Sequence, residues 1–199
     1  MTVKYLNCIK EKTMVIEECQ LPEILGDEEV EGHTVCSMIS AGTEIHACFL
    51  NVFNWGFPRK PGYTAVFQIE RMGSKVEGLA IGDYVFCMAN HQSFQRMHYR
   101  SVVKIPEGVS PQSALFCRMA GVSLATLNRT SIMPGEKLMI TGLGPVGFTA
   151  MMVWSQLGYK VIAVDPDENR RDLRIAMGER LLAGADRECE IHNAAIKGL

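Results

Sequence analysis

The sequence lacks a basic block, a long apolar run and any closely spaced pair of cysteines. Its net charge is −2, from 20 Lys and Arg against 22 Asp and Glu. Without a basic stripe to neutralise phosphates, no nucleic-acid partner is expected. No apolar run reaches the roughly 18 residues of a membrane span, and Met1–Lys10 has no apolar centre typical of a signal peptide. We therefore expect a cytoplasmic protein with no membrane partner.

The seven cysteines are scattered, odd in number and free of any C-x-x-C spacing. A disulfide framework or a zinc knuckle requires paired spacing, so neither is predicted. We interpret the cysteines as small apolar residues in a reducing compartment. Hydrophobic residues make up 47% and charged residues 21% of the 199 positions, which is typical of a soluble globular chain with one large or two small domains.

Residues 1–125 contain many short strand-like runs separated by turn signals such as Gly26-Asp27 and Gly82-Asp83. This spacing is typical of an antiparallel barrel or sandwich. Between the third and fourth runs, Asn51–Pro61 has no clean period and is expected to be a loop. The expected strands are Val3–Ile9, Met14–Glu18, Thr34–Ile39, Ala65–Glu70, Tyr84–Cys87 and Ser101–Ile105.

Residues 126–199 show a different pattern, preceded by helical spacing over Gln112–Arg129. Lys137–Thr141 and Lys160–Asp165 are apolar runs suited to buried parallel strands, and Phe148–Leu157 between them is compatible with a helix. Alternating strands and helices indicate βαβ units, so the predicted fold class is α/β. The remaining expected elements are a helix at Glu168–Met177, a strand at Arg180–Leu182 and a last helix at Asp186–Lys197.

The motif G-x-G-x-x-G lies between the first predicted strand and the helix that follows it, at Gly142-Leu143-Gly144-Pro145-Val146-Gly147. In a dinucleotide site the first glycine permits the tight turn, the second lets the backbone approach a pyrophosphate, and the third lets the helix lie close to the strand. The N–H groups at the helix N-terminus favour the phosphate charge. The alternative is a glycine turn in an α/β protein that binds no nucleotide.

Asp165 ends the next predicted strand, roughly 20 residues after Gly142, at the expected place for a residue that binds the adenosine ribose. A 2′-phosphate would face this carboxylate, so NAD is favoured over NADP as the cofactor. Arg170 and Arg171 follow closely and leave NADP open. The alternative for Asp165 is a capping role for the helix that follows.

The β-rich segment followed by this fingerprint resembles the medium-chain dehydrogenase/reductase family, the zinc alcohol dehydrogenases and their relatives. The resemblance runs over most of the chain and implies a GroES-like β-barrel substrate and catalytic domain at 1–125, with a Rossmann doubly wound parallel sheet from 126. The segments that carry it are Ile39–His46, Pro61–Tyr63, Gly82–Phe86, Val102–Ser110, Ala120–Leu127 and Met133–Gly158.

The zinc ligands that the family pattern implies are missing. Zinc-dependent members read C-G-T-D-x-H where this chain begins with Ala41, and G-H-E where it has Tyr63 in the middle. The third ligand, a cysteine in the family, would stand at about the position of Met119, and Cys117 lies two residues before that position. The four-cysteine lobe is replaced by a segment with one sulfur ligand, Cys87. Because a catalytic zinc needs three protein ligands, the sequence predicts a zinc-independent protein with no bound metal.

Proton chemistry is still available to the residues that remain. In the family, a hydroxyl residue and a histidine relay a proton, and Thr43 and His46 stand at those positions. Tyr63, at the lost ligand's place, would offer a phenol to a carbonyl oxygen. The alternatives are a turn residue for Thr43, a solvated surface group for His46 and core packing for Tyr63.

The resemblance implies a NAD(P)-dependent oxidoreductase that transfers a hydride to or from an alcohol, a ketone or an activated alkene. The alternative is a dinucleotide-binding sensor or structural protein, or an inactive fragment. Only the first half of a Rossmann domain fits before Leu199, so the chain looks C-terminally truncated and is expected to be inactive alone. Uncovered strand edges favour a homo-oligomer, and the expected partner is a small-molecule substrate.

Overall fold

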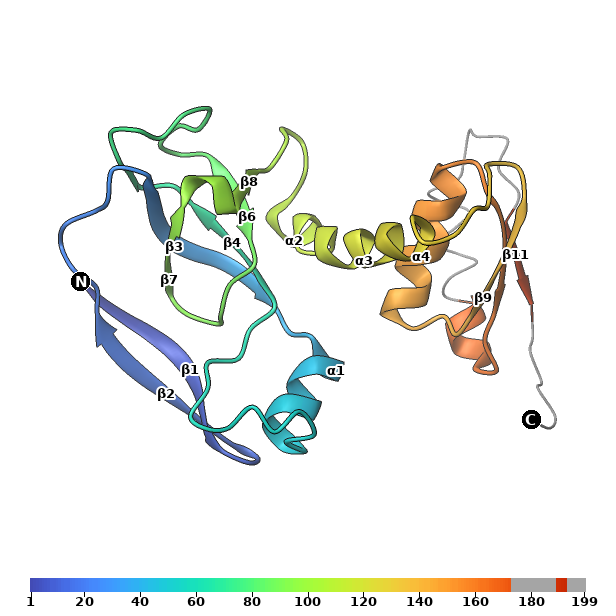
Figure 1. Ribbon diagram of the computed structural model, residues 1–199, viewed down its shortest axis with the longest axis horizontal. Helices are drawn as coiled ribbons and strands as arrows, with labels where there is room; N and C mark the ends of the chain where they lie inside the picture. The colour runs from blue at the N-terminus through green and yellow to red at the C-terminus, as the bar shows by residue number, and fades with distance from the viewer. Residues whose placement is uncertain (173–188, 193–199) are drawn as a thin grey trace. The chain divides into compact units, whose positions relative to one another are not determined.

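The computed structural model describes residues 1–172 and the backbone of residues 189–192. The chain forms two compact units, Met1–Phe116 and Cys117–Leu199 (Figure 1). The first unit is mainly antiparallel β-structure, and the second combines helices with a parallel sheet. No helix in the described part of the chain is long and apolar enough to cross a membrane.

The first unit contains a two-stranded hairpin and a larger antiparallel sheet. The larger sheet has the order β5-β3-β4-β6-β8, with β7 also paired to β3, and within the described residues this pairing does not close into a ring. β7 was not predicted from the sequence. The hairpin is β1 (Thr2–Lys10) and β2 (Thr13–Gln20); the sheet is β3 (Glu29–Met38), β4 (Thr64–Gln68), β5 (Arg71–Met72), β6 (Tyr84–Cys87), β7 (Phe94–His98) and β8 (Val102–Lys104).

β4 is the central strand of this sheet, between β3 and β6. Successive side chains of a strand point to opposite faces, and both faces of β4 are buried. Ala65 and Phe67 belong to the main core, while Val66 packs against Ala114 and Leu115 on the other face. The continuous apolar run of this strand therefore reflects cover on both sides.

The helical segments of the first unit are short. α1 (Ala41–Glu44) continues into a π-helical turn, η1 (Ile45–Phe49), and a 3₁₀ turn, η2 (Tyr99–Ser101), precedes β8. α2 (Pro111–Ala114) is capped at its N-terminus by Ser110, whose Oγ accepts the Ser113 N–H at 3.2 Å. The prediction of one continuous helix over Gln112–Arg129 was wrong. The segment is divided into α2 and α3 (Cys117–Leu127), which belong to different units.

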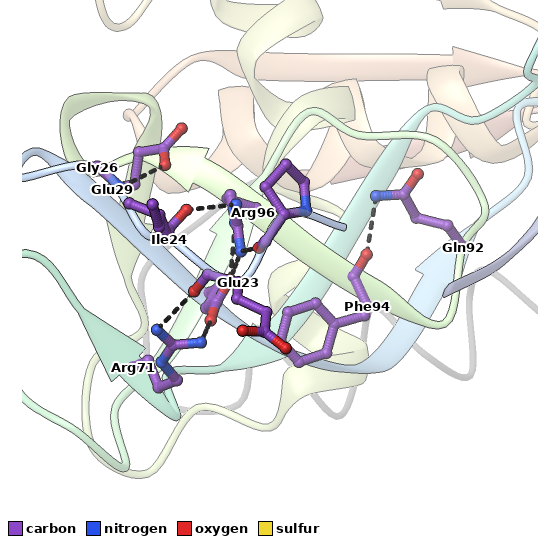
Figure 2. A network of polar contacts seen from close by, with 10 residues as sticks. Glu23, Ile24, Gly26, Glu29, Arg71, Gln92, Phe94 and Arg96 are labelled. Atoms are coloured by element: carbon purple, nitrogen blue, oxygen red, sulfur yellow. Dashed lines mark hydrogen bonds and ion pairs between the residues drawn. The ribbon is translucent and has the colours of Figure 1, made fainter. Parts of the chain in front are cut away.

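Glu31 on β3 is a buried carboxylate that two arginines neutralise. Its side chain is 2% exposed and pairs with Arg96 at 2.6 Å and with Arg71 at 2.9 Å. The same arginines donate to carbonyls of the loop after β2: Arg96 to Ile24 at 3.1 Å and Arg71 to Glu23 at 3.1 Å (Figure 2). A buried charge is tolerated only when it is paired, so this network fixes the loop onto the sheet.

Three of the cysteines are buried as expected, Cys8, Cys48 and Cys87, while Cys117 is exposed. Burial disfavours the charged thiolate, and it raises the pKa of Cys87 to about 12 and that of Cys48 to about 11. These two thiols therefore stay protonated near neutral pH and pack as small apolar groups.

The second unit is built on three parallel strands in the order β11-β10-β9. β9 (Lys137–Thr141) pairs with β10 (Lys160–Val164) in the register Leu138↔Val161, and β11 (Cys189–His192) pairs with the other edge of β10. This 3-2-1 order is that of the first half of a doubly wound sheet. α3 and α4 (Pro145–Gln156) pack against each other, and residues 168–172 begin a further helix.

The helix predicted over Asp186–Lys197 was wrong at its centre, because Cys189–His192 forms β11. Pairing with β10 supplies ladder hydrogen bonds that the local sequence does not reveal, and tertiary context overrides such weak local preferences. The strand predicted at Arg180–Leu182 and the end of the helix predicted at Glu168–Met177 lie outside the described residues.

Helix α4 packs closely on β9 at Gly147. A Cβ added at Gly147 would overlap the Gly142 carbonyl oxygen and touch Ile140 of β9 at 3.4 Å. The buried residues around this contact, which form the core of the second unit, are Ile140, Leu143, Phe148, Ala150, Met151, Val161 and Ala163.

We predict that Gly147→Ala destabilises the second unit by about 1–3 kcal/mol, the usual cost of an overpacked core. Gly121 in α3 is the matched control, because a Cβ added there meets nothing within 4 Å. Gly121→Ala should stabilise its helix by up to about 1 kcal/mol through helix propensity. Urea denaturation followed by circular dichroism compares the two, and equal effects of both substitutions would contradict the close packing at Gly147.

Candidate functional site

The glycine loop connects the carboxyl end of β9 to α4. Gly142 has φ 91°, a backbone conformation that L side chains rarely adopt, and its N–H donates to the Val164 carbonyl at 2.7 Å. Gly144 is the N-cap residue of α4, and Pro145 occupies the first turn, where a missing N–H leaves no helical bond unmade. The loop therefore turns directly from a strand into a helix N-terminus.

Gly144 differs from the other two glycines of the motif because nothing in the fold requires it. Its φ of −65° is open to any residue, and an added Cβ would meet nothing within 4 Å. Gly142 is required by its positive φ and Gly147 by packing. The space in front of Gly144 is what a group approaching the backbone closely would need.

This space is part of a cavity of about 470 Å³ in the second unit. Five of the six predicted loop positions line it: Gly142, Gly144, Pro145, Val146 and Gly147. Val146 is 54% exposed. Leu143 is fully buried and belongs to the core beneath the loop. The rest of the wall is formed by Val122, Ser123, Thr126, Ile140, Thr141, Ala150 and Trp154.

Asp165, directly after β10, is 1% exposed and uses both carboxylate oxygens on the backbone. Oδ2 accepts the Leu143 N–H of the glycine loop at 2.6 Å, and Oδ1 accepts the Asp167 N–H at 2.8 Å. These two N–H groups, and then the charge of Arg170, hold the pKa of Asp165 below its usual range. The carboxylate therefore remains ionised at neutral pH and ties the loop to the neighbouring strand.

The residues after Asp165 have separate roles. Asp167 accepts the Asn169 N–H at 3.0 Å, as expected of the residue that caps the helix starting at 168. Arg171 donates to the Asp165 carbonyl at 2.7 Å. Arg170 is 56% exposed and lies 3.7 Å from Asp165 Oδ2. A cation and an anion thus stand together directly after β10.

The three predicted catalytic residues lie in the first unit. Thr43 and His46 are exposed on the continuous segment formed by α1 and η1, and they bond to different partners. Thr43 Oγ1 accepts from Ser40 Oγ at 2.9 Å, and His46 Nδ1 donates to the Gly42 carbonyl at 2.6 Å. Tyr63 is half-buried directly before β4.

Three residues that are not zinc ligands occupy the positions where the family pattern has them. Ala41 is the first residue of α1, Tyr63 precedes β4, and Met119 lies in α3. Among residues 1–172 and 189–192, no group of three or more His, Cys, Asp or Glu side chains is arranged to hold a metal ion.

The first unit also contains a hydrogen-bonded group that motif reading did not predict. His91 bonds Ser37 on one side and Glu44 on the other. Glu44 lies in the segment Ile39–His46 and Ser37 just before it, but His91 is 47 and 54 positions further along the chain, so no local pattern joins the three residues.

Comparison with known proteins finds dehydrogenases that are similar to this chain in sequence. L-galactonate-5-dehydrogenase of Escherichia coli K12 is 26% identical over 204 residues, covering 86% of this chain and 58% of the relative. An alcohol dehydrogenase of Geobacillus stearothermophilus is 25% identical over 209 residues, covering 86% of this chain and 60% of the relative. The chain therefore spans less than two thirds of the length of these relatives. No protein-family model matches it.

Solved structures share the fold over nearly the whole chain. 2R,3R-butanediol dehydrogenase from Bacillus subtilis superposes with a TM-score of 0.78 at 15% identity, covering 99% of this chain and 65% of that one. A protein described as a short chain alcohol dehydrogenase from E. coli CFT073, complexed with NADH, gives 0.75 at 16% identity, with 98% and 64% covered. A Helicobacter pylori protein complexed with NADP(H) gives 0.72 at 14% identity, with 89% and 63% covered.

The comparisons indicate the same fold as the glycine motif and the parallel strand–loop–helix–strand unit that contains it. The fold is that of a GroES-like unit followed by the first strands of a Rossmann unit. The chain is thus similar in sequence to these two dehydrogenases and shares its fold with the solved dehydrogenase structures.

Proposed function

We propose that this chain binds a nicotinamide dinucleotide and forms part of an NAD(P)-dependent oxidoreductase. The observation that carries the proposal is the open space in front of Gly144 at the N-terminus of α4, inside a cavity of about 470 Å³. Backbone N–H groups at a helix start and a close approach to the backbone are what a pyrophosphate requires. The cofactor, when bound, supplies or accepts the hydride.

The protein's own residues would bind and orient the reactants. The loop positions Gly142, Leu143, Gly144, Pro145, Val146 and Gly147 would hold the pyrophosphate, and Asp165 the adenosine ribose. Thr43 and His46 would move a proton to or from the substrate oxygen, and Tyr63 would donate a hydrogen bond to a carbonyl. The substrate would be an alcohol, a ketone or an activated alkene, and polarisation would come from hydrogen bonds rather than zinc.

We predict that Gly144→Ala weakens binding of ADP-ribose roughly tenfold or more, because the new methyl group would fill the space that the pyrophosphate needs; a cost of about 1.4 kcal/mol is tenfold. The fold should be unaffected, since the backbone of Gly144 suits alanine. Calorimetry on the unaltered protein, Gly144→Ala and the control Gly121→Ala measures this. Unchanged affinity in Gly144→Ala, or no binding by the unaltered protein, would refute the site.

For the choice of cofactor, we predict tighter binding of NAD than of NADP by roughly tenfold or more. A 2′-phosphate would face the buried, ionised Asp165, and the like charges would repel. Competition for the ADP-ribose site by the two dinucleotides gives the ratio. Equal or tighter binding of NADP would show that Arg170 dominates, and NADP affinity should then fall in Arg170→Ala.

Zinc independence and hydride transfer can be tested together. Elemental analysis should find far less than one zinc per chain, because Ala41, Tyr63 and Met119 cannot supply a three-ligand site. Oxidation of NADH or NADPH with a panel of ketones, aldehydes and activated alkenes should be insensitive to a chelator. Stoichiometric zinc that survives dialysis would overturn the first expectation. Cofactor binding without turnover on the panel would favour the non-catalytic alternative.

A further inference from the structure

The first unit contains a second group of reactive side chains, separate from the proposed relay residues. Ser37 lies near the end of β3, Glu44 ends α1, and His91 lies in the loop between β6 and β7. Ser37 Oγ is 2.8 Å from His91 Nδ1, and His91 Nε2 is 3.1 Å from Glu44 Oε1. A hydroxyl, an imidazole and a carboxyl group therefore follow one another within hydrogen-bond distance.

The carboxylate determines which nitrogen of His91 carries the proton. An ionised carboxylate only accepts hydrogen bonds, so Nε2–H donates to Glu44 and Nδ1 is left with a lone pair. That lone pair faces the hydroxyl of Ser37, which donates to it. A nucleophile bonded to a base, with the base oriented by a third group, is the arrangement that activates a serine.

The base is buried and held in place, while the nucleophile is accessible. His91 is 8% exposed, and its backbone is fixed on both sides: its N–H donates to the Pro61 carbonyl, and its carbonyl accepts from Leu6, each at 2.9 Å. Glu44 is 13% exposed and also accepts the Ser40 N–H at 3.1 Å. Ser37 is exposed, so a reagent in solution can reach its oxygen.

We propose that Ser37, His91 and Glu44 form a nucleophilic centre that accepts an acyl group from activated carboxylic esters. Ser37 Oγ attacks the carbonyl carbon and forms a C–O bond while its proton passes to His91 Nδ1. The bond to the leaving oxygen then breaks, and that oxygen takes the proton from His91. Water repeats the two steps on the Ser37 ester and releases the carboxylic acid. Glu44 acts as a positioning residue that stabilises the imidazolium.

Ser74 provides an internal comparison. It is an exposed serine of the same unit whose Oγ donates to the Asp27 carboxylate at 3.0 Å. Like Ser37, Ser74 is exposed and has a carboxylate nearby, but its hydroxyl donates a hydrogen bond to Asp27 rather than to a histidine. If the Ser37 group only joins β3 to the loop before β7, the two serines should react alike.

The test uses the full chain and p-nitrophenyl acetate, with acetylated peptides quantified by mass spectrometry at short times. General-base assistance contributes at least about 100-fold, so Ser37 should be acetylated about 100-fold faster than Ser74. His91→Gln and Glu44→Gln should bring the Ser37 rate down towards that of Ser74, with circular dichroism as the check on folding.

Equal acetylation of Ser37 and Ser74 in the unaltered protein would overturn the proposal, and this result does not depend on any variant folding. Fast acetylation of Ser37 that persists in folded His91→Gln would also overturn it, because the base would then be irrelevant. Fast acetylation that falls in a folded variant of either partner supports it. None of these measurements involves a dinucleotide, so the outcome is independent of the proposed oxidoreductase function.

Discussion

The parallel pairing of β9 with β10 is the constraint on which the candidate cofactor site depends. Because parallel strands end at the same edge of a sheet, the residues that follow β9 and β10 are neighbours there. The pairing continues past both strands: Gly142 N–H bonds Val164, and Leu143 N–H bonds the side chain of Asp165. The glycine loop is therefore shaped by the next strand as much as by its own sequence. The contact at Gly147 then fixes where α4 begins.

Local patterns predicted much of this architecture. Tyr84–Cys87 and Lys137–Thr141 have the same bounds in the structure as in the sequence prediction, since both are short apolar runs bounded by turn signals. β7 was missed because Phe94–His98 mixes polar and apolar residues, and its pairing with β3 defines it. β11 was mistaken for part of a helix for the same reason. Strands defined by distant partners leave little trace in local sequence.

The candidate site residues were likewise predictable where the signal is local and not where the contacts join distant parts of the chain. The glycine motif was recognisable because its glycines have the expected spacing and lie between a predicted strand and a predicted helix. The bond of Asp165 to Leu143 was not foreseeable, because it joins residues 22 positions apart. Ser37, Glu44 and His91 were not brought together either, since His91 lies 54 and 47 positions from its two partners. Glu31 and Glu44 show that burial alone does not define a role: one carboxylate is neutralised by two arginines, and the other is bonded to a histidine.

The two bonds of Asp165 also bear on attempts to redesign cofactor preference. Exchanging the acidic residue after the second strand for a small or basic one is an obvious way to admit a 2′-phosphate. In this chain the same exchange would release the Leu143 and Asp167 N–H groups that the carboxylate satisfies, and the Leu143 donor, which is buried, would cost about 1–3 kcal/mol if left unpaired. Under the proposed role of Asp165, selectivity and loop order would depend on the same side chain, and a useful redesign would have to supply a substitute acceptor before altering the charge.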